Sequence, residues 1–326
     1  MWRRGGSELA FRAVAPRRPD LHTPLSSSAH VRRRTLLRGG IGGLGVVALG
    51  GLSAACSSEG ETVADGVDPG PDRRLQALFP RDVAFVAAES PSRLPYTLVD
   101  AEGIPVAAID GPMTFTISFD GEQVGDPVEV APRSDGVPRP YLPLYTTFPR
   151  PGLYDIDATY EDTALNSQVQ VHLAADVAQP LVGTVLPPAS TPTLGQSFDV
   201  DPICTRAPQC PFHEVDLTTA LGTGKPVVVL LATPAYCQTA ACGPILDLLV
   251  DEAGGRDDLI VIHAEVYKNP KAVADLSQAD LAPLPATYEM FWEPSLFVTD
   301  AANTIVARGD IVVDRGEMAE MLALAV

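Results

Sequence analysis

The segment that decides the fold reads PVVVLL at residues 226–231 and continues as ATPAYCQTAACGP at residues 232–244. An unbroken aliphatic run of this length is typical of a strand that is covered on both faces. Proline is tolerated in the first turn of a helix but disrupts the interior, so Pro244 predicts a helix that begins around Cys242 or Gly243. The sequence therefore places Cys237 and Cys242 where a buried strand passes into a helix.

Strand and helix patterns alternate on both sides of this segment. The expected strands cover residues 259–267, 295–298 and 304–308, and the expected helices cover residues 216–221 and 317–324, with Asp216 and Asp314 as capping residues. Such alternation indicates an α/β domain, which we place at residues 198–326.

The two cysteines have a chemical reason to lie at this point. The amino end of a helix lowers the pKa of a cysteine through its dipole and its free N–H groups, and the resulting thiolate attacks disulfides or peroxides. Four residues separate Cys237 from Cys242. A disulfide needs α-carbons about 5.5 Å apart, so the spacing permits a bond between them without requiring one.

These features together resemble thioredoxin-like proteins. Residues 224–244 resemble the first central strand and redox-active turn of that superfamily, and WEPSLFVTD at residues 292–300 resembles its cis-proline entering a strand. The resemblance implies a thioredoxin-like fold for residues 198–326. It also implies that Cys237 and Cys242 exchange disulfides and that Pro294 shapes the backbone facing the substrate.

The segment also departs from the thioredoxin pattern of two residues between the cysteines. If residues 242–244 are aligned on that pattern, Ile245 takes the second cysteine position, and Cys237 must be the partner. The strand before the motif lacks the buried acid that thioredoxins use for proton transfer. His263 and Glu265, on one face of the next strand, are the candidate substitutes, and a surface or packed pair is the competing interpretation.

Two other thioredoxin-fold chemistries fit less well. Peroxiredoxins share the four-residue gap but keep a threonine three residues before the nucleophile, whereas Thr233 lies four before Cys237. Copper delivery of the Sco type pairs two cysteines with a distant downstream histidine. His263 is near in sequence and lies within a strand, so this interpretation needs His213 instead.

The remaining pair, Cys204 and Cys210, brackets a proline-containing loop. In an exported protein such a pair most often forms a structural disulfide, worth about 2 kcal/mol for so short a loop. The alternative is a relay that exchanges with Cys237 and Cys242. The spacings and an oxidising compartment disfavour zinc binding by these four cysteines. We expect no metal and no cofactor.

Residues 78–175 have the pattern of an all-β domain. MTFTISF at residues 113–119 alternates apolar with hydroxyl side chains and then meets Asp120-Gly121, a hairpin signal. FPRPGLY at residues 148–154 resembles the tyrosine corner of immunoglobulin-like sandwiches. Further strands are expected at residues 96–99, 127–130, 154–160 and 169–173. We expect a β-sandwich, then a semi-rigid proline-rich linker at residues 176–197.

The first 55 residues differ from the rest in charge. They hold nine arginines and two acids, a formal net charge of +7, so the chain's total of -18 leaves -25 for the remainder. A body this acidic argues against a nucleic-acid partner. Arg33-Arg34 before a Gly-rich apolar stretch resembles a twin-arginine signal, and LSAAC ending at Cys56 resembles a bacterial lipobox. Lipid attachment at Cys56 and a flexible tether at residues 56–77 are expected.

The sequence thus predicts a multidomain protein with an N-terminal immunoglobulin-like sandwich and a C-terminal thioredoxin-like domain. We expect a lipid-anchored thiol-disulfide oxidoreductase on the outer face of a bacterial membrane. Its expected partners are exported thiol or disulfide proteins or a membrane electron donor. The alternative is a non-enzymatic binding lipoprotein whose thioredoxin-like domain is a disulfide-stapled scaffold.

Overall fold

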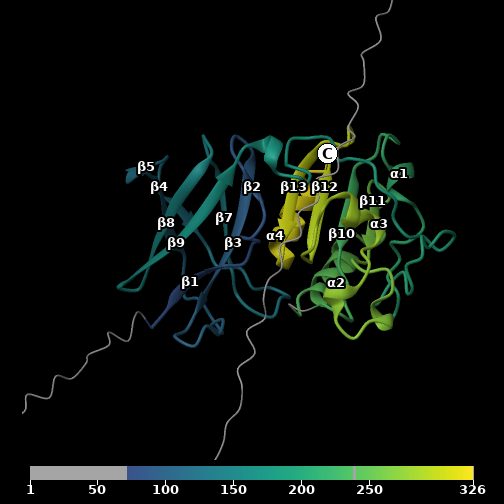
Figure 1. Cartoon of the computed structure of the whole chain (residues 1–326), viewed down its shortest axis with the longest axis horizontal. Coiled ribbons are helices and arrows are strands. Elements are labelled where there is room, and N and C mark those ends of the chain that lie inside the picture. The colour runs from purple at the N-terminus through teal and green to yellow at the C-terminus, as the bar shows by residue number, and fades with distance from the viewer. Residues whose placement is uncertain (1–71, 238–239, 326) are drawn as a thin grey trace, which may run out of the picture. The chain divides into compact units, whose positions relative to one another are not determined.

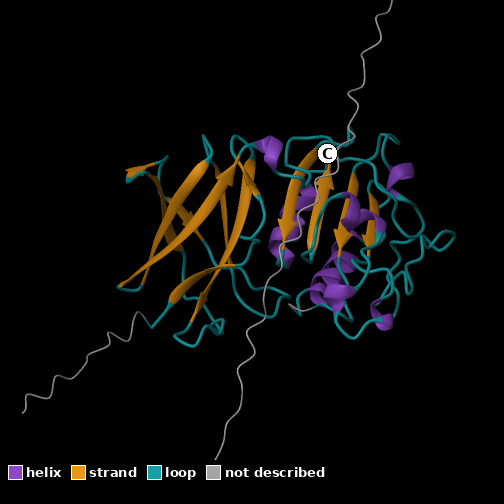
Figure 2. Ribbon diagram, viewed as in Figure 1, coloured by secondary structure: helices purple, strands orange, loops and turns teal. Residues whose placement is uncertain are grey.

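The structure is a computed structural model that describes residues 72–237 and 240–325 (Figure 1). The expected signal residues Arg33 and Arg34 and the expected lipid-attachment residue Cys56 lie outside this part of the chain. The described part is mostly β with few helices (Figure 2). Strand β1 begins at Arg74, inside the range predicted as a tether, so the tether prediction is wrong at its carboxyl end.

The N-terminal sandwich, residues 74–172, consists of two sheets that share one apolar core. Strands β1, β3 and β7 form one sheet, and β2-β9-β8-β4-β5 form the other, with β6 paired to β4. The strands are β1 (Arg74–Ala77), β2 (Val86–Ala87), β3 (Pro91–Val99), β4 (Met113–Phe119), β5 (Glu122–Gln123), β6 (Val128–Val130), β7 (Leu142–Thr147), β8 (Gly152–Tyr160) and β9 (Thr163–His172). Tyr96, Phe115 and Tyr154 are fully buried in the core.

The local signals in this region predicted its turns correctly. Asp120 and Gly121 both adopt positive φ and join β4 to β5, as a tight hairpin requires. Tyr154 Oη donates a hydrogen bond of 2.9 Å to the carbonyl oxygen of Arg150, which is the bond that a tyrosine corner makes. Strand β4 has the predicted bounds, whereas β1, β2 and β7 were not predicted.

The C-terminal sheet has the order β11-β10-β12-β13. Strand β10 pairs parallel to β11 and antiparallel to β12, which pairs antiparallel to β13. The strands are β10 (Val227–Leu231), β11 (Ile260–Ala264), β12 (Ser295–Thr299) and β13 (Ile305–Asp310). The α-helices are α1 (Leu217–Ala220), α2 (Cys242–Ala253), α3 (Pro283–Thr287) and α4 (Arg315–Ala323), and short 3₁₀ turns are η1 (Ala174–Asp176), η2 (Pro270–Ala272) and η3 (Leu276–Gln278). The predicted strands and helices of this region are all present.

Both faces of strand β10 are covered by apolar side chains, which explains its aliphatic sequence. Val228 and Leu230 pack in one cluster with residues of α2 and α4. The alternate positions, Val227, Val229 and Leu231, pack in a second cluster with residues of α1 and α3. Because successive side chains of a strand point to opposite faces, every position of β10 must be apolar.

The segment predicted as a semi-rigid linker belongs to the C-terminal core instead. The backbone N–H of Gly183 donates to Ile305 O at 2.8 Å, and that of Leu186 donates to Asn303 O at 2.9 Å. Leu186 and Ala189 are buried in the cluster that contains α1 and α3. The prolines suggested a spacer, but the apolar residues between them pack beside β13.

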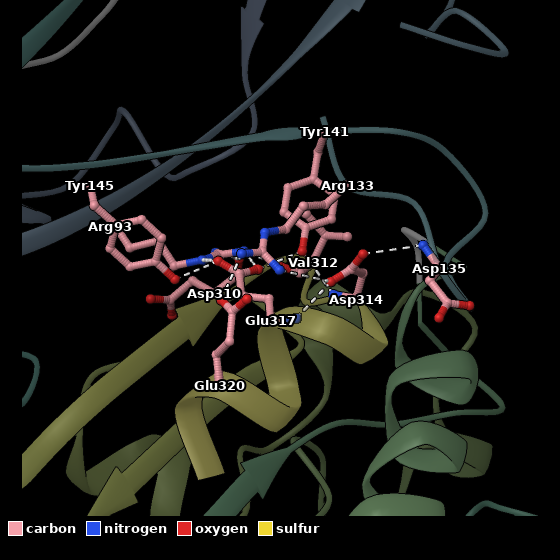
Figure 3. A network of polar contacts seen from close by, with 10 residues as sticks. All are labelled: Arg93, Arg133, Asp135, Tyr141, Tyr145, Asp310, Val312, Asp314, Glu317 and Glu320. Atoms are coloured by element: carbon pink, nitrogen blue, oxygen red, sulfur yellow. Dashed lines mark hydrogen bonds and ion pairs between the residues drawn. The ribbon is translucent and has the colours of Figure 1, made fainter. Parts of the chain in front are cut away.

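A buried ion pair joins the sandwich to helix α4 (Figure 3). The guanidinium of Arg93 on β3 donates two bonds of 2.7 Å to the carboxylate of Glu317. The same carboxylate accepts from Tyr145 at 2.5 Å and from Tyr141. Burial alone raises the pKa of Glu317, but Arg93 and these donors outweigh it and lower the pKa below its ordinary value. The carboxylate is therefore held ionised at the first turn of α4, which Asp314 caps.

Candidate functional site

Cys237 and Cys242 are joined by a disulfide, with their α-carbons 6.0 Å apart. Helix α2 begins at Cys242, as Pro244 predicted. Cys242 is fully buried, whereas Cys237 is half-buried. A partner must therefore approach the disulfide from the side of Cys237, and the sulfur of Cys242 lies at the positive end of the helix dipole.

The cis-proline expected at Pro294 is present, since the Glu293–Pro294 peptide bond is cis. Strand β12 runs antiparallel to β10, and its register pairs Leu231 with Ser295. The residue that follows β10 and the residue that precedes β12 therefore lie at the same end of the sheet. This arrangement brings Pro294 and its neighbours to the end of β10, from which the cysteine-bearing turn leaves.

Glu293 is the buried acid of this site, and the sequence did not lead us to predict it. One of its carboxylate oxygens lies within 4.8 Å of the sulfurs of both Cys237 and Cys242. Burial raises the pKa of Glu293 to about 7, against the opposing effect of its hydrogen bond with Thr233. Its Oε2 atom has no hydrogen-bond partner among the described residues. The available signal was an acid directly before the proline of the expected cis bond.

His263 and Glu265, the residues expected to move protons at the disulfide, contact the segment of the other cysteine pair. His263 Nδ1 lies 3.4 Å from Cys210 Sγ and 3.7 Å from Cys204 Sγ. The carboxylate of Glu265 accepts from Thr205 N at 2.5 Å and from Thr205 Oγ1 at 3.1 Å. Burial raises the pKa of Glu265 to about 8, against these hydrogen bonds from Thr205. Their predicted role at Cys237 and Cys242 remains a prediction.

The prediction of a disulfide between Cys204 and Cys210 is wrong for this structure. Both are free, buried cysteines whose sulfurs are 3.8 Å apart. His213 and His263 converge on them, and the four potential ligand atoms all lie within 4.8 Å of one another. Hydrogen bonds from Cys210 and from both histidines lower the pKa of Cys204. We expected no metal, whereas this cluster is a set of two sulfurs and two imidazole nitrogens that divalent transition metals prefer.

Two further features of the described residues bear on function. A cavity of about 360 Å³ lies between the sandwich and β13, and Phe85, Arg93, Arg308 and Met321 are among the residues that line it. None of the four cysteines described above lines this cavity. Within residues 72–237 and 240–325, no helix is both long and apolar enough to span a membrane.

Comparisons with known proteins do not name a family. No known family matches this chain, and no curated protein matches its sequence significantly. Among solved structures, a tandem of titin immunoglobulin domains is similar over 32% of this chain, with 11% identity and a TM-score of 0.21; this chain covers 49% of that one. A superoxide reductase (neelaredoxin) from Ignicoccus hospitalis is similar over 31% of this chain and 81% of its own, with 12% identity and a TM-score of 0.22. Similarities this weak carry no argument.

Proposed function

We propose that the protein is a thiol-disulfide oxidoreductase that acts through Cys237 and Cys242. The observation that carries this proposal is the disulfide at the start of α2, with the buried carboxylate of Glu293 within 4.8 Å of both sulfurs. The sheet supports a thioredoxin-like fold, because α2 follows β10, β11 is parallel to β10, and two antiparallel strands precede α4. The Tyr154–Arg150 bond likewise supports an immunoglobulin-like sandwich.

The accessible sulfur determines the order of steps. When a substrate is oxidised, its thiolate attacks Cys237 Sγ, the Cys237–Cys242 bond breaks, and Cys242 leaves as a thiolate. A mixed disulfide then joins the substrate to Cys237. A second substrate thiolate attacks the substrate sulfur of this bond, which forms the substrate disulfide and releases Cys237. The substrate loses two electrons and the cysteine pair gains them, and the reverse sequence reduces a substrate disulfide.

Glu293 supplies the proton in this scheme. A carboxyl group with a pKa of about 7 is both protonated and deprotonated in useful amounts near neutral pH. Its neutral form donates to the Cys242 thiolate as the disulfide opens, and its carboxylate takes the proton back when the disulfide re-forms. The buried position that raises the pKa also keeps competing water away from the proton.

The location and partners of the protein are part of the same proposal. Arg33 and Arg34 support twin-arginine export, and the small residues before Cys56 support lipid attachment at that cysteine. The site would then act on the outer face of a bacterial membrane. Its partners would be exported proteins with thiols or disulfides, or a membrane electron donor. An electron donor re-reduces the cysteine pair after it has reduced a substrate disulfide, whereas a disulfide oxidant must take up the two electrons after it has oxidised a substrate.

Thiol trapping with mass spectrometry tests the proposal. The purified protein is equilibrated across graded dithiothreitol ratios, and each cysteine is alkylated and assigned. A Cys237–Cys242 bond that titrates above about -300 mV is labile enough for exchange, and Cys242→Ser should trap mixed disulfides at Cys237. Cys237→Ser is the matched control and should trap none at Cys242. A bond that resists reduction throughout would contradict the proposal and favour a non-enzymatic scaffold.

A further inference from the structure

We propose that Cys204, Cys210, His213 and His263 bind one Zn²⁺ ion in a closed tetrahedral site. The exchange reaction proposed above acts through Cys237 and Cys242, with Glu293 as the proton donor. The inference concerns a second site, and the failure of either proposal leaves the other standing. It depends on the distances between the four ligand atoms, on the tautomer of one histidine, on the contacts that hold the ligands, and on their burial.

The distances between the ligand atoms match the edges of a zinc-centred tetrahedron. Zinc bonds of about 2.3 Å to sulfur and about 2.05 Å to nitrogen give edges of about 3.8 Å between sulfurs, about 3.5 Å between sulfur and nitrogen and about 3.3 Å between nitrogens. The two sulfurs lie 3.8 Å apart, and the two histidine nitrogens lie 3.2 Å apart. His263 Nδ1 lies 3.4 Å from Cys210 Sγ and 3.7 Å from Cys204 Sγ, and His213 Nε2 lies 3.3 Å from Cys210 Sγ. Each is within about 0.2 Å of the tetrahedral value.

The tautomer of His263 suits metal binding. His263 Nε2 lies 2.9 Å from Ala232 O, and a carbonyl oxygen can only accept, so Nε2 carries the hydrogen. His263 Nδ1 then presents a lone pair to the cluster. Zinc-binding histidines typically donate their other ring N–H to a carbonyl or carboxylate in this way. His213 presents Nε2 to the same point, with its ring edge-to-face against that of His263.

Backbone and side-chain contacts hold His213 and Cys204 beside strand β11, which carries His263. The N–H of His263 donates to Phe212 O at 3.1 Å, which fixes His213 beside His263. Glu265, directly after β11, accepts from both the N–H and the hydroxyl of Thr205. These bonds hold Thr205, and therefore the adjacent Cys204, against the same strand. The site is thus built from three separate segments that meet on β11.

Burial and charge favour a structural site over an open, catalytic one. All four side chains are buried, with residue exposures of 8% for Cys204, 3% for Cys210, 1% for His213 and 0% for His263. A closed set of four ligands leaves no position for a substrate. Binding releases both thiol protons, and the two thiolates neutralise the charge of Zn²⁺, so no net charge is buried.

The competing chemistry for these cysteines is a disulfide. A disulfide requires a sulfur–sulfur distance of about 2.05 Å, well short of the 3.8 Å observed. A disulfide would also give no role to the two buried histidine nitrogens, which face each other and the sulfurs. The zinc site accounts for the cysteines and the histidines together.

Metal analysis of the purified full-length protein, kept reduced, tests the proposal. We expect one Zn²⁺ per chain, and after exchange with Co²⁺ the visible absorption of tetrahedral cobalt together with thiolate-to-cobalt charge transfer. X-ray absorption on the zinc protein should give two sulfur and two nitrogen ligands. These measurements use the unaltered chain, so they do not depend on whether a variant folds.

Variants locate the ion. Cys210→Ser and His213→Ala should each weaken zinc binding by about 100-fold or more, whereas Cys237→Ser and His172→Ala should leave it unchanged. Loss of zinc in Cys237→Ser would overturn the assignment, because the ion would then belong to the other pair. A metal-free protein with a Cys204–Cys210 disulfide, or one that takes up Cu⁺ and no Zn²⁺, would overturn it as well.

Discussion

The two cysteine pairs of the C-terminal region have nearly the same spacing and opposite surroundings. Cys237 and Cys242 are five positions apart and form a disulfide, while Cys204 and Cys210 are six apart and do not. The first pair lies at a helix start beside a carboxylate, with Cys237 half-buried. The second is buried against two histidines. The neighbouring groups, and not the spacing, distinguish the pair that we propose for exchange from the pair that we propose as zinc ligands.

The two pairs differ because different groups contact their sulfurs near the end of the sheet. At the carboxyl end of β10 the chain turns into α2, whose free N–H groups favour a thiolate at Cys242. Beside β11, Cys204 and Cys210 contact imidazole nitrogens, which would bind the proposed Zn²⁺ ion together with the two thiolates and so compete with their oxidation. If the two pairs have separate roles, a substitution at one pair should leave the chemistry of the other unchanged.

The largest expected effect is on exchange itself. Cys237→Ser removes the accessible sulfur, so disulfide exchange with a reduced protein substrate should fall by about 1,000-fold or more, as expected when a covalent nucleophile is lost. His213→Ala should lower the exchange rate by less than about threefold per folded molecule, because the contacts of its ring nitrogen are with Cys210 and His263. A comparable loss in both variants would show that the two pairs act as one site.

The next effect is on stability and tests whether both sites belong to one folding unit. Arg93→Met leaves the carboxylate of Glu317 buried and unpaired, which should lower the free energy of unfolding by about 3–5 kcal/mol. The double variant Arg93→Met/Glu317→Leu should recover much of this loss, because neither charge remains. Chemical denaturation, followed by fluorescence and by thiol accessibility, measures the free energy of unfolding of the single and the double variant.

The exposed Arg81 offers the control for this experiment. Arg81→Met should change the free energy of unfolding by less than about 0.5 kcal/mol. If Cys210 and the reduced Cys242 become accessible at different denaturant concentrations in Arg93→Met, the two sites do not unfold together. Coincident transitions are the expected result, since α4, which carries Glu317, packs in one cluster with both cysteines.

The sequence predicted the structural surroundings of Cys237 and Cys242 well because the signals for them are local. The aliphatic strand β10, the helix start at Cys242 and the cap at Asp314 each depend on residues within one turn or strand, and the structure contains all three. Strand β7 escaped prediction because Pro143 interrupts its pattern and only pairing with β3 reveals it. Local chemistry does not specify pairing between distant strands.

The cluster of Cys204, Cys210, His213 and His263 could not be predicted in the same way. His263 lies 50 positions after His213, and only the sheet brings them together. The one local signal was the gap of two residues between Cys210 and His213, a spacing that zinc ligands often show. The expectation of a disulfide between Cys204 and Cys210 hid this signal, because it treated Cys210 as the partner of a cysteine and not of a histidine. Glu293 was missed for a similar reason, because the acid was sought on the strand before the motif.

A smaller effect concerns Glu293 and pH. Its folded pKa of about 7 lies above the ordinary value of 4.5, so its contribution is fully present below pH 4.5 and is lost as the pH rises through 7. Glu293 alone should therefore lower the free energy of unfolding of the oxidised protein by about 3 kcal/mol across this window, in addition to any contribution from Glu265. Glu293→Gln should flatten that part of the profile, while the exposed Glu289→Gln should not. An unchanged slope in Glu293→Gln would show that the carboxyl is not buried beside the disulfide as the structure places it.

The smallest effect tests how the cation site is supported. Glu265 is not one of the four proposed zinc ligands. Its carboxylate accepts hydrogen bonds from the N–H and the hydroxyl of Thr205 and so positions the adjacent Cys204. Glu265→Gln keeps one acceptor oxygen and should weaken zinc binding by about tenfold, and Glu265→Ala should weaken it by up to about 100-fold. Zinc affinity, measured by competition with a chromophoric chelator, distinguishes positioning from general destabilisation, because Arg93→Met lowers stability without touching the ligands. If Arg93→Met weakens zinc binding as much as Glu265→Ala does, the site depends on overall stability alone. If only the Glu265 series weakens zinc binding, this carboxylate determines how tightly the buried pair holds its cation.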